Sequence, residues 1–161
     1  SKGFDMIGWR IGFVAGNERI VNAFADVKDN CDSGQFIAIQ NAAAAALELP
    51  AIGERIREKY RRRMEKLVTV LQNCGWKASM PGGSYFLYVR SPKGIEGGPS
   101  FSNGEDASQY LIRERSICTV PWDDAEPYLR FSVTYQAPTE AEEDALMKTL
   151  EERLKQDSYL W

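Results

Sequence analysis

Histidine is absent from this sequence of 161 residues. Its absence excludes Ser-His and Cys-His nucleophilic pairs, HExxH metalloproteases and zinc or haem sites with histidine ligands. Any catalytic chemistry must therefore use lysine, arginine, tyrosine or carboxylate side chains.

Cysteine is scarce: the sequence has only Cys31, Cys74 and Cys118, which are widely spaced and form no CxxC motif. An odd number of cysteines without such a motif indicates neither a disulfide framework nor a cysteine-rich metal site. We interpret them as small apolar residues that fill space, and we expect no metal site.

The sequence also lacks a large excess of one charge and a long apolar run. Twenty Lys and Arg against 23 Asp and Glu leave a net charge of −3, which does not suit a nucleic-acid-binding protein. The longest apolar run, Ala42–Leu47, is far shorter than the roughly 20 residues of a membrane span, and no N-terminal stretch resembles a signal peptide. We expect a cytoplasmic protein whose partners are neither nucleic acids nor membranes.

Residues 1–35 contain a short apolar run, Trp9–Ala15, which lies between glycines and predicts a strand. Asn17 predicts the cap of a helix that reaches about Lys28, and the turn-forming residues that follow indicate a boundary. Because a single short strand cannot satisfy its own hydrogen bonds, we expect it to pair with a sheet upstream of this chain. The first residue is Ser1 and not Met, so we also expect the chain to be part of a longer protein.

Residues 36–161 predict helices alternating with the strands of a small sheet. The long helix 51–73 has an apolar stripe with three- and four-residue spacing, and its triplet Arg61–Arg63 is expected on a solvated face. The remaining predicted strands cover 76–79, 84–90, 116–120 and 128–135. Helices are predicted over 36–49, from a Ser102/Glu105 capping box to Arg115, and from a Thr139/Glu142 capping box onward. The last helix directs Leu146, Leu150 and Leu154 toward the core. The order predicts an α/β or α+β fold without internal repeats.

Three cationic residues are candidates for chemistry. Lys2 and Arg10 stand near a glycine-interrupted turn, where a lysine could act as a nucleophile and an arginine could bind phosphate. The spacing alone is more typical of a solvated terminal lysine and an arginine on an edge strand than of a catalytic pair. Arg130 lies between apolar residues of a predicted strand, so it needs an anionic ligand or a structural ion pair.

Three segments resemble one known family in the same order along the chain. SKGFDMIGWRIGFVAG is similar to the lysine segment of the pyridoxal-phosphate-dependent class I/II aminotransferases of fold type I. PGGSYF resembles the family's Pro-Gly-Gly turn, and YLRFS resembles its substrate-arginine strand. The resemblance covers essentially the whole chain. Within the family, the resemblance is strongest to the bacterial LL-diaminopimelate aminotransferases. The segments that carry it are DVKDNCDSGQFIAIQNAA, GFVAGN and SQYLIRERSICTVPWDDAEPYLRFSVTY.

The resemblance implies a role for each candidate residue. Lys2 would bind pyridoxal 5′-phosphate covalently and later transfer a proton, and Arg10 would bind the cofactor phosphate with Ser1 close by. Arg130 would bind the substrate α-carboxylate through two parallel hydrogen bonds. Ser33, in a turn where the family reaches toward the partner subunit's site, would contribute to substrate binding. The implied substrates are an amino acid and a 2-oxo acid, and the implied assembly is a homodimer.

The family's other cofactor residues precede its lysine, so they are absent here. The resemblance thus implies that residues 1–35 end the cofactor-binding large domain and that residues 36–161, including helix 51–73, form the small C-terminal domain. We expect the isolated chain to be inactive. Aspartate, alanine and aromatic aminotransferases share the same motifs and stay open as alternatives, as does a non-catalytic fragment that serves only folding or dimerisation.

Overall fold

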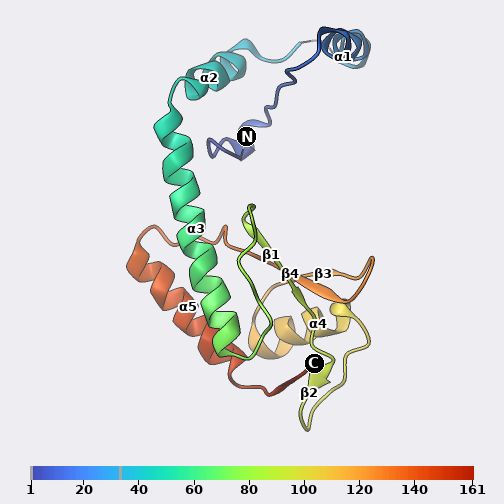
Figure 1. Ribbon diagram of the computed structural model, residues 1–161, viewed down its shortest axis with the longest axis vertical. Coiled ribbons are helices and arrows are strands. Elements are labelled where there is room, and N and C mark those ends of the chain that lie inside the picture. Colours follow the sequence, from blue (N-terminus) through green and yellow to red (C-terminus); the bar gives the residue numbers. More distant parts are fainter. Residues whose placement is uncertain (1, 33) are drawn as a thin grey trace. The chain divides into compact units, whose positions relative to one another are not determined.

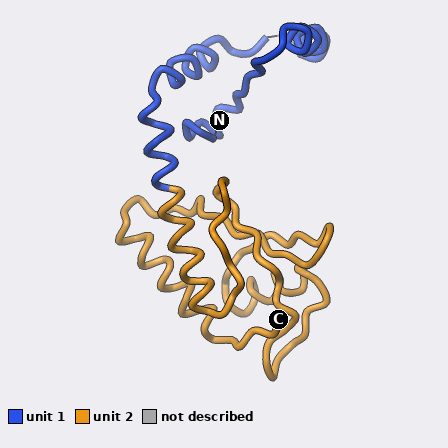
Figure 2. Tube along the Cα trace, viewed as in Figure 1, with its two compact units in different colours: residues 1–59 blue, residues 60–161 orange. Residues whose placement is uncertain are grey.

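The structure is a computed structural model that describes residues 2–32 and 34–161 (Figure 1). The chain divides into two compact units, Ser1–Lys59 and Tyr60–Trp161 (Figure 2). Helices combine with small antiparallel sheets, which confirms the predicted mixed fold class. The predicted domain boundary after residue 35 stays a prediction.

The first unit consists of short helices without a core of its own. It contains the 3₁₀ helix η1 (Ile7–Trp9), α1 (Glu18–Cys31), α2 (Ile37–Leu47) and the beginning of α3 (Pro50–Asn73). None of its described residues is fully buried. The Asn17 side chain accepts a hydrogen bond from the Arg19 N–H at 3.0 Å, as expected of a helix cap.

The strand predicted over Trp9–Ala15 does not form within the described chain, and its pairing with a sheet upstream stays a prediction. Trp9 ends η1, and residues 11–15 form no ladder with any described residue. A strand is stable only when a neighbour satisfies its backbone N–H and C=O groups, and the described chain supplies none here. Arg10 therefore does not lie on an edge strand. It adopts the left-handed conformation, with φ 53°, as the residue that ends η1.

The second unit is built around a three-stranded antiparallel sheet. Its strands are β1 (Phe86–Arg90), β3 (Val120–Trp122) and β4 (Tyr128–Ser132), in the order β1-β4-β3. The short strands β2 (Gly94–Ile95) and β5 (Tyr159–Leu160) form a separate pair.

One face of the three-stranded sheet packs into the core. Leu87 and Val89 of β1 and Leu129 and Phe131 of β4 point to this face and are at most 5% exposed. They meet apolar residues of α3, α4 (Gly104–Arg115) and α5 (Glu140–Leu154). The core residues contributed by these helices are Met64, Leu67, Val68, Val70, Leu71, Ala107, Leu111, Met147 and Leu154. Alternation along the strands thus leaves the opposite face for polar and aromatic residues.

The predicted helices agree better with the structure than the predicted strands. The Thr139/Glu142 capping box is present, whereas the cap of α4 is Asn103, which accepts a hydrogen bond from the Asp106 N–H, and not Ser102. The segment 76–79 forms no strand, and β3 begins only at Val120, the last residue of the predicted strand 116–120, and continues to Trp122. These strand errors share a cause, since pairing depends on partners far away in the sequence.

Two further details concern the helices of the described chain. Leu154 is fully buried and Leu150 partly so, but Leu146 is 38% exposed, and Met147 fills its expected place in the core. Within residues 2–32 and 34–161, no helix is both long and apolar enough to cross a membrane.

Candidate active site

Arg130 lies at the centre of the sheet face that points away from the core. It is on β4, the middle strand, where it is paired with Tyr88 of β1 and with Val120 of β3. Its neighbours Leu129 and Phe131 point into the core, so strand alternation directs the Arg130 side chain outward. The residue is half-buried.

Aromatic rings surround the Arg130 guanidinium. Its central carbon lies 4.4 Å from the centroid of the Phe86 ring and 5.7 Å from that of Trp122. Trp122 in turn meets Tyr88 edge to face, with centroids 5.6 Å apart. A guanidinium is attracted to the negative face of an aromatic ring, and stacking restricts its orientation without using its hydrogen-bond donors.

Arg130 has no ion pair with a carboxylate of any residue that the structure describes. This argues against a structural ion pair within the described part of the chain. A partly buried, restrained guanidinium with free donors is suited to bind a carboxylate through two parallel hydrogen bonds.

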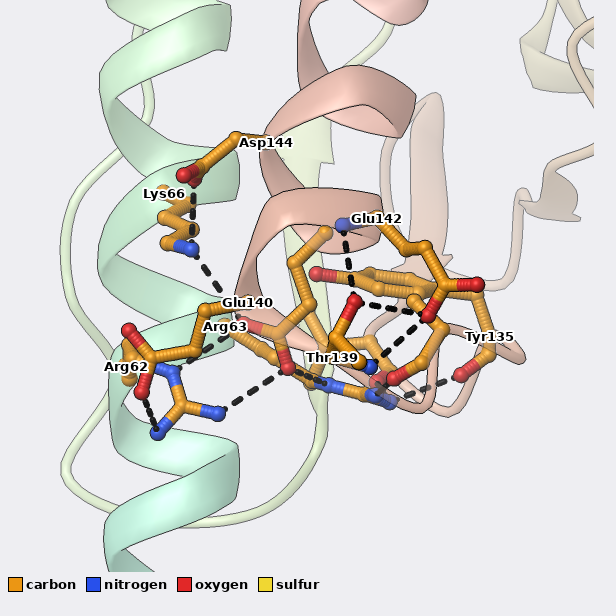
Figure 3. A network of polar contacts seen from close by, with 11 residues as sticks. Arg62, Arg63, Lys66, Tyr135, Thr139, Glu140, Glu142 and Asp144 are labelled. Atoms are coloured by element: carbon orange, nitrogen blue, oxygen red, sulfur yellow. Dashed lines mark hydrogen bonds and ion pairs between the residues drawn. The ribbon is translucent and has the colours of Figure 1, made fainter.

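The chain that follows β4 is held by a buried arginine of α3. Arg63 is 3% exposed, and its guanidinium donates to the carbonyl oxygens of Tyr135 and Ala137 at 2.7 Å and of Val133 at 3.3 Å. Its Nε also donates to Glu143 of α5 at 2.7 Å. Figure 3 shows this cluster between α3 and α5. The cluster restrains the residues that follow the Arg130 strand.

Glu143 is the common acceptor of this cluster. It is 1% exposed and accepts hydrogen bonds from Arg62, Arg63 and Lys66 at 2.7–3.2 Å. The hydrogen bonds from Arg62 lower the pKa of Glu143 most; burial opposes them, and those from Arg63 and Lys66 add to them, so that the pKa is about 2. The carboxylate is therefore charged at neutral pH.

The solvated face predicted for the arginine triplet is wrong for two of its members. Arg61 pairs with Glu65 on the exposed side of α3, at 2.6 Å, whereas Arg62 and Arg63 point toward Glu143. The helical spacing indicated neighbouring carboxylates on α3 itself, but the decisive partner comes 80 residues later.

Lys2 and Arg10 both lie in the first unit, on exposed positions. The Lys2 amine has no ion pair or hydrogen bond with a described residue, and the Arg10 guanidinium makes one contact of 3.4 Å, to the Ile7 carbonyl. An amine and a guanidinium without carboxylate partners fit the aldehyde and the phosphate of pyridoxal 5′-phosphate. Ser1 and Ser33, the other predicted site residues, lie outside the described residues.

Phe86 and Trp122 are functional candidates that the sequence did not single out. Phe86 and Tyr88 alternate with Leu87 and Val89 along the predicted strand 84–90, so they share the face opposite the core. In the structure Tyr88 is 43% exposed and Trp122 likewise. Trp122 was expected in a turn, so no local signal brought it near Arg130.

Comparison with known proteins is consistent with this arrangement. The family of class I and II aminotransferases matches residues 1–150. The LL-diaminopimelate aminotransferase of Methanocaldococcus jannaschii is 51% identical over 96% of this chain and 39% of its own length. That of Methanococcus maripaludis is 45% identical over 100% of this chain and 40% of its own length.

The fold of the chain also occurs in solved structures. An aminotransferase from Staphylococcus aureus matches with a TM-score of 0.77 and 22% identity, over 94% of this chain and 39% of that one. The chain thus spans about two fifths of the length of the curated relatives that it matches. From the family match over residues 1–150, the chain belongs to the class I and II aminotransferases.

Proposed function

We propose that the protein containing this chain is a pyridoxal-phosphate-dependent aminotransferase that acts on LL-diaminopimelate. The second substrate would be 2-oxoglutarate, which accepts the amino group and becomes glutamate. The observation that carries the reaction class is Arg130, a restrained guanidinium without a carboxylate partner among the described residues. The names of the two relatives, at 51% and 45% identity, support LL-diaminopimelate as the substrate. Such a reaction serves lysine biosynthesis.

In this proposal Arg130 binds the α-carboxylate of the substrate. The planar fork of its guanidinium matches the two oxygens of a carboxylate, and stacking on Phe86 keeps the fork in one plane. Every amino acid and 2-oxo acid of the reaction has this carboxylate, so one arginine can serve both half-reactions.

Lys2 and Arg10 would hold the cofactor. The Lys2 amine would bind its aldehyde carbon, and the Arg10 guanidinium would bind its phosphate. Pyridoxal 5′-phosphate, when bound, supplies the electron sink that makes the substrate α-proton acidic. The Lys2 amine would accept the proton from the substrate α-carbon and would later return a proton. Ser1 and Ser33, as further ligands of the cofactor and the substrate, are part of the proposal.

We include in the proposal the organisation of the full-length enzyme. Residues 1–35 would complete the large cofactor-binding domain and residues 36–161 would form the small domain, in a cytoplasmic homodimer. The family membership supports this organisation. The remaining three fifths of the relatives' length would supply the other cofactor ligands.

A substrate panel tests the proposal. The full-length enzyme, loaded with pyridoxal 5′-phosphate, is assayed with LL-diaminopimelate, aspartate, alanine and phenylalanine as amino donors to 2-oxoglutarate. We expect the highest kcat/KM with LL-diaminopimelate. A higher kcat/KM with one of the other three donors would contradict the proposed substrate, and no transamination of any donor would contradict the reaction class.

A further inference from the structure

A second cluster of cations lines a cavity that contains neither Arg130 nor any residue of the proposed cofactor site. The cavity lies in the second unit and has a volume of about 520 Å³, within the usual range of small-molecule sites. Its cationic lining residues are Lys77, Arg90 and Lys93, and no Asp or Glu side chain lines it.

The positive charge of this cavity is largely uncompensated. Arg90 pairs with Glu126, but Lys77 and Lys93 have no ion pair or side-chain hydrogen bond with any residue of 2–32 or 34–161. Most other cations of the second unit have acidic partners. Two unpaired ammonium groups that line one cavity repel each other unless an anion lies between them.

Two aromatic residues, Phe101 and Trp161, form apolar walls of the same cavity. Both rings are held in place from behind, because Phe101 lies 5.3 Å from Tyr110 and Trp161 lies 5.2 Å from Trp76, between ring centroids. Fixed rings of this kind can stack on a flat ligand at a small cost in conformational entropy.

The backbone around Lys93 is also fixed. Its N–H donates to the Leu160 carbonyl and its carbonyl accepts from the Phe101 N–H, both at 2.7 Å. Lys93 is therefore joined to both aromatic walls through their adjacent backbone. The cavity combines a rigid frame, flat apolar walls and free positive charge.

We propose that this cavity binds an organic anion that carries a planar ring, with a nucleoside monophosphate as the representative ligand. Lys77 and Lys93 bind the phosphate as two point charges, and the ring lies against Phe101 and Trp161. Neither the family assignment nor the Arg130 site requires such a ligand, so this proposal is independent of the proposed function.

The test is an NMR titration of the 161-residue chain with adenosine 5′-monophosphate, adenosine and inorganic phosphate, at low and high salt. The monophosphate should bind saturably, with shifts at the Lys93 and Phe101 amides and the Trp161 indole. It should bind about tenfold more tightly than either adenosine or phosphate, because each of these lacks one of the two contacts. Salt should weaken binding, since the exposed ammonium groups are screened.

Variants locate the site. Lys77→Gln and Lys93→Gln should each weaken monophosphate binding about tenfold, the usual scale for one charge-assisted contact. Lys148→Gln is the matched control, because Lys148 is an exposed lysine of α5 outside this cavity, and it should leave binding unchanged.

Four results would overturn the proposal. If adenosine bound as tightly as its monophosphate, the lysine charges would contribute nothing to binding. If inorganic phosphate bound as tightly as the monophosphate, the aromatic walls would contribute nothing. Full affinity in a Lys77→Gln/Lys93→Gln double variant would place the ligand elsewhere. The absence of saturable shifts would show that the cavity is no site.

Discussion

Arg130 differs from Arg63 and Arg115 in what surrounds it. Arg63 uses its donors on a carboxylate and three carbonyls, and Arg115 pairs with Asp157. Arg130 instead contacts the faces of Phe86 and Trp122, which leave its donors open. This contrast between saturated and open guanidinium groups is the residue-scale basis for assigning a substrate contact to Arg130.

Replacing Arg130 should reduce transamination by the full-length enzyme. We expect Arg130→Ala to raise KM and to lower kcat/KM by about 2–4 kcal/mol of lost charge pairing with the carboxylate. Steady-state kinetics with LL-diaminopimelate measure this loss. Arg113→Ala, at an exposed position of α4, is the control and should leave kcat/KM unchanged. If the Arg130→Ala enzyme had the same kinetics as the control, the proposal that Arg130 binds the substrate carboxylate would be wrong.

Glu143 makes stability depend on pH. Its pKa is about 2 in the folded chain against an ordinary value of 4.5, so the folded state binds fewer protons. The resulting stabilisation is present above pH 4.5 and is lost as the pH falls toward 2. We expect Glu143→Gln to lower the free energy of unfolding at pH 7 by about 3 kcal/mol, with a difference from the wild type that shrinks below pH 4.5.

Urea unfolding of the 161-residue chain at pH 7, 5 and 3 measures this effect. Glu140→Gln is a matched control, because Glu140 also lies on α5 and contacts Arg62, at 3.2 Å, but is 67% exposed. It should change the free energy of unfolding by less than about 1 kcal/mol. Equal effects of the two substitutions would mean that burial of Glu143 adds nothing to its ion pairs.

At the scale of elements, the helices depend on local caps. At the start of α5 the Thr139 hydroxyl accepts from the Glu142 N–H at 3.3 Å, and the Glu142 carboxylate accepts from the Thr139 N–H at 2.8 Å. These two bonds satisfy backbone groups that the first helical turn leaves free.

Removing this cap should destabilise the second unit. We expect Thr139→Ala to lower the free energy of unfolding by about 1 kcal/mol. Thr149→Ala, in the middle of the same helix, removes a hydroxyl that bonds only to the Ala145 carbonyl, and it should have no destabilising effect. Chemical denaturation of both variants decides the matter, and a neutral Thr139→Ala would contradict the importance of the cap.

The difference between local and distant contacts explains which elements could be predicted from the sequence. The caps Asn17 and Thr139 act within three residues, and both are present as predicted. The segments 9–15 and 76–79 were predicted as strands, but a strand needs a distant partner that the pattern does not identify. The outward direction of Arg130 could be predicted from strand alternation. The rings that surround it belong to β1 and β3, and only the pairing of both strands with β4 brings Phe86 and Trp122 near it.

At the scale of the whole molecule, the two units differ in how much they bury. The second unit has a contiguous core around Trp76, Leu71 and Phe131, whereas no described residue before Tyr60 is fully buried. Helix α1 exposes Ile20, Phe24 and Val27, spaced as one helical face, by 48–65%. Burial of apolar area is the main source of stability, so we expect the second unit to be much more stable than the first.

Hydrogen exchange of the isolated chain tests this difference. Amides of α4 and α5 should be protected by most of the global free energy of unfolding, whereas those of α1 and α2 should exchange at nearly the rates of an unfolded peptide. Limited proteolysis should leave a resistant fragment that contains residues 60–161. Comparable protection of α1 and α5 would contradict the account, because it would require a core that the first unit lacks.

The central claim, that this is the lysine-bearing part of a pyridoxal-phosphate enzyme, is tested most directly at Lys2. The full-length enzyme loaded with pyridoxal 5′-phosphate is reduced with borohydride, digested and analysed by peptide mass spectrometry, with a Lys2→Arg variant as control. We expect a stable phosphopyridoxyl group on Lys2 that is absent from the variant. A label on another lysine, or on none, would contradict it.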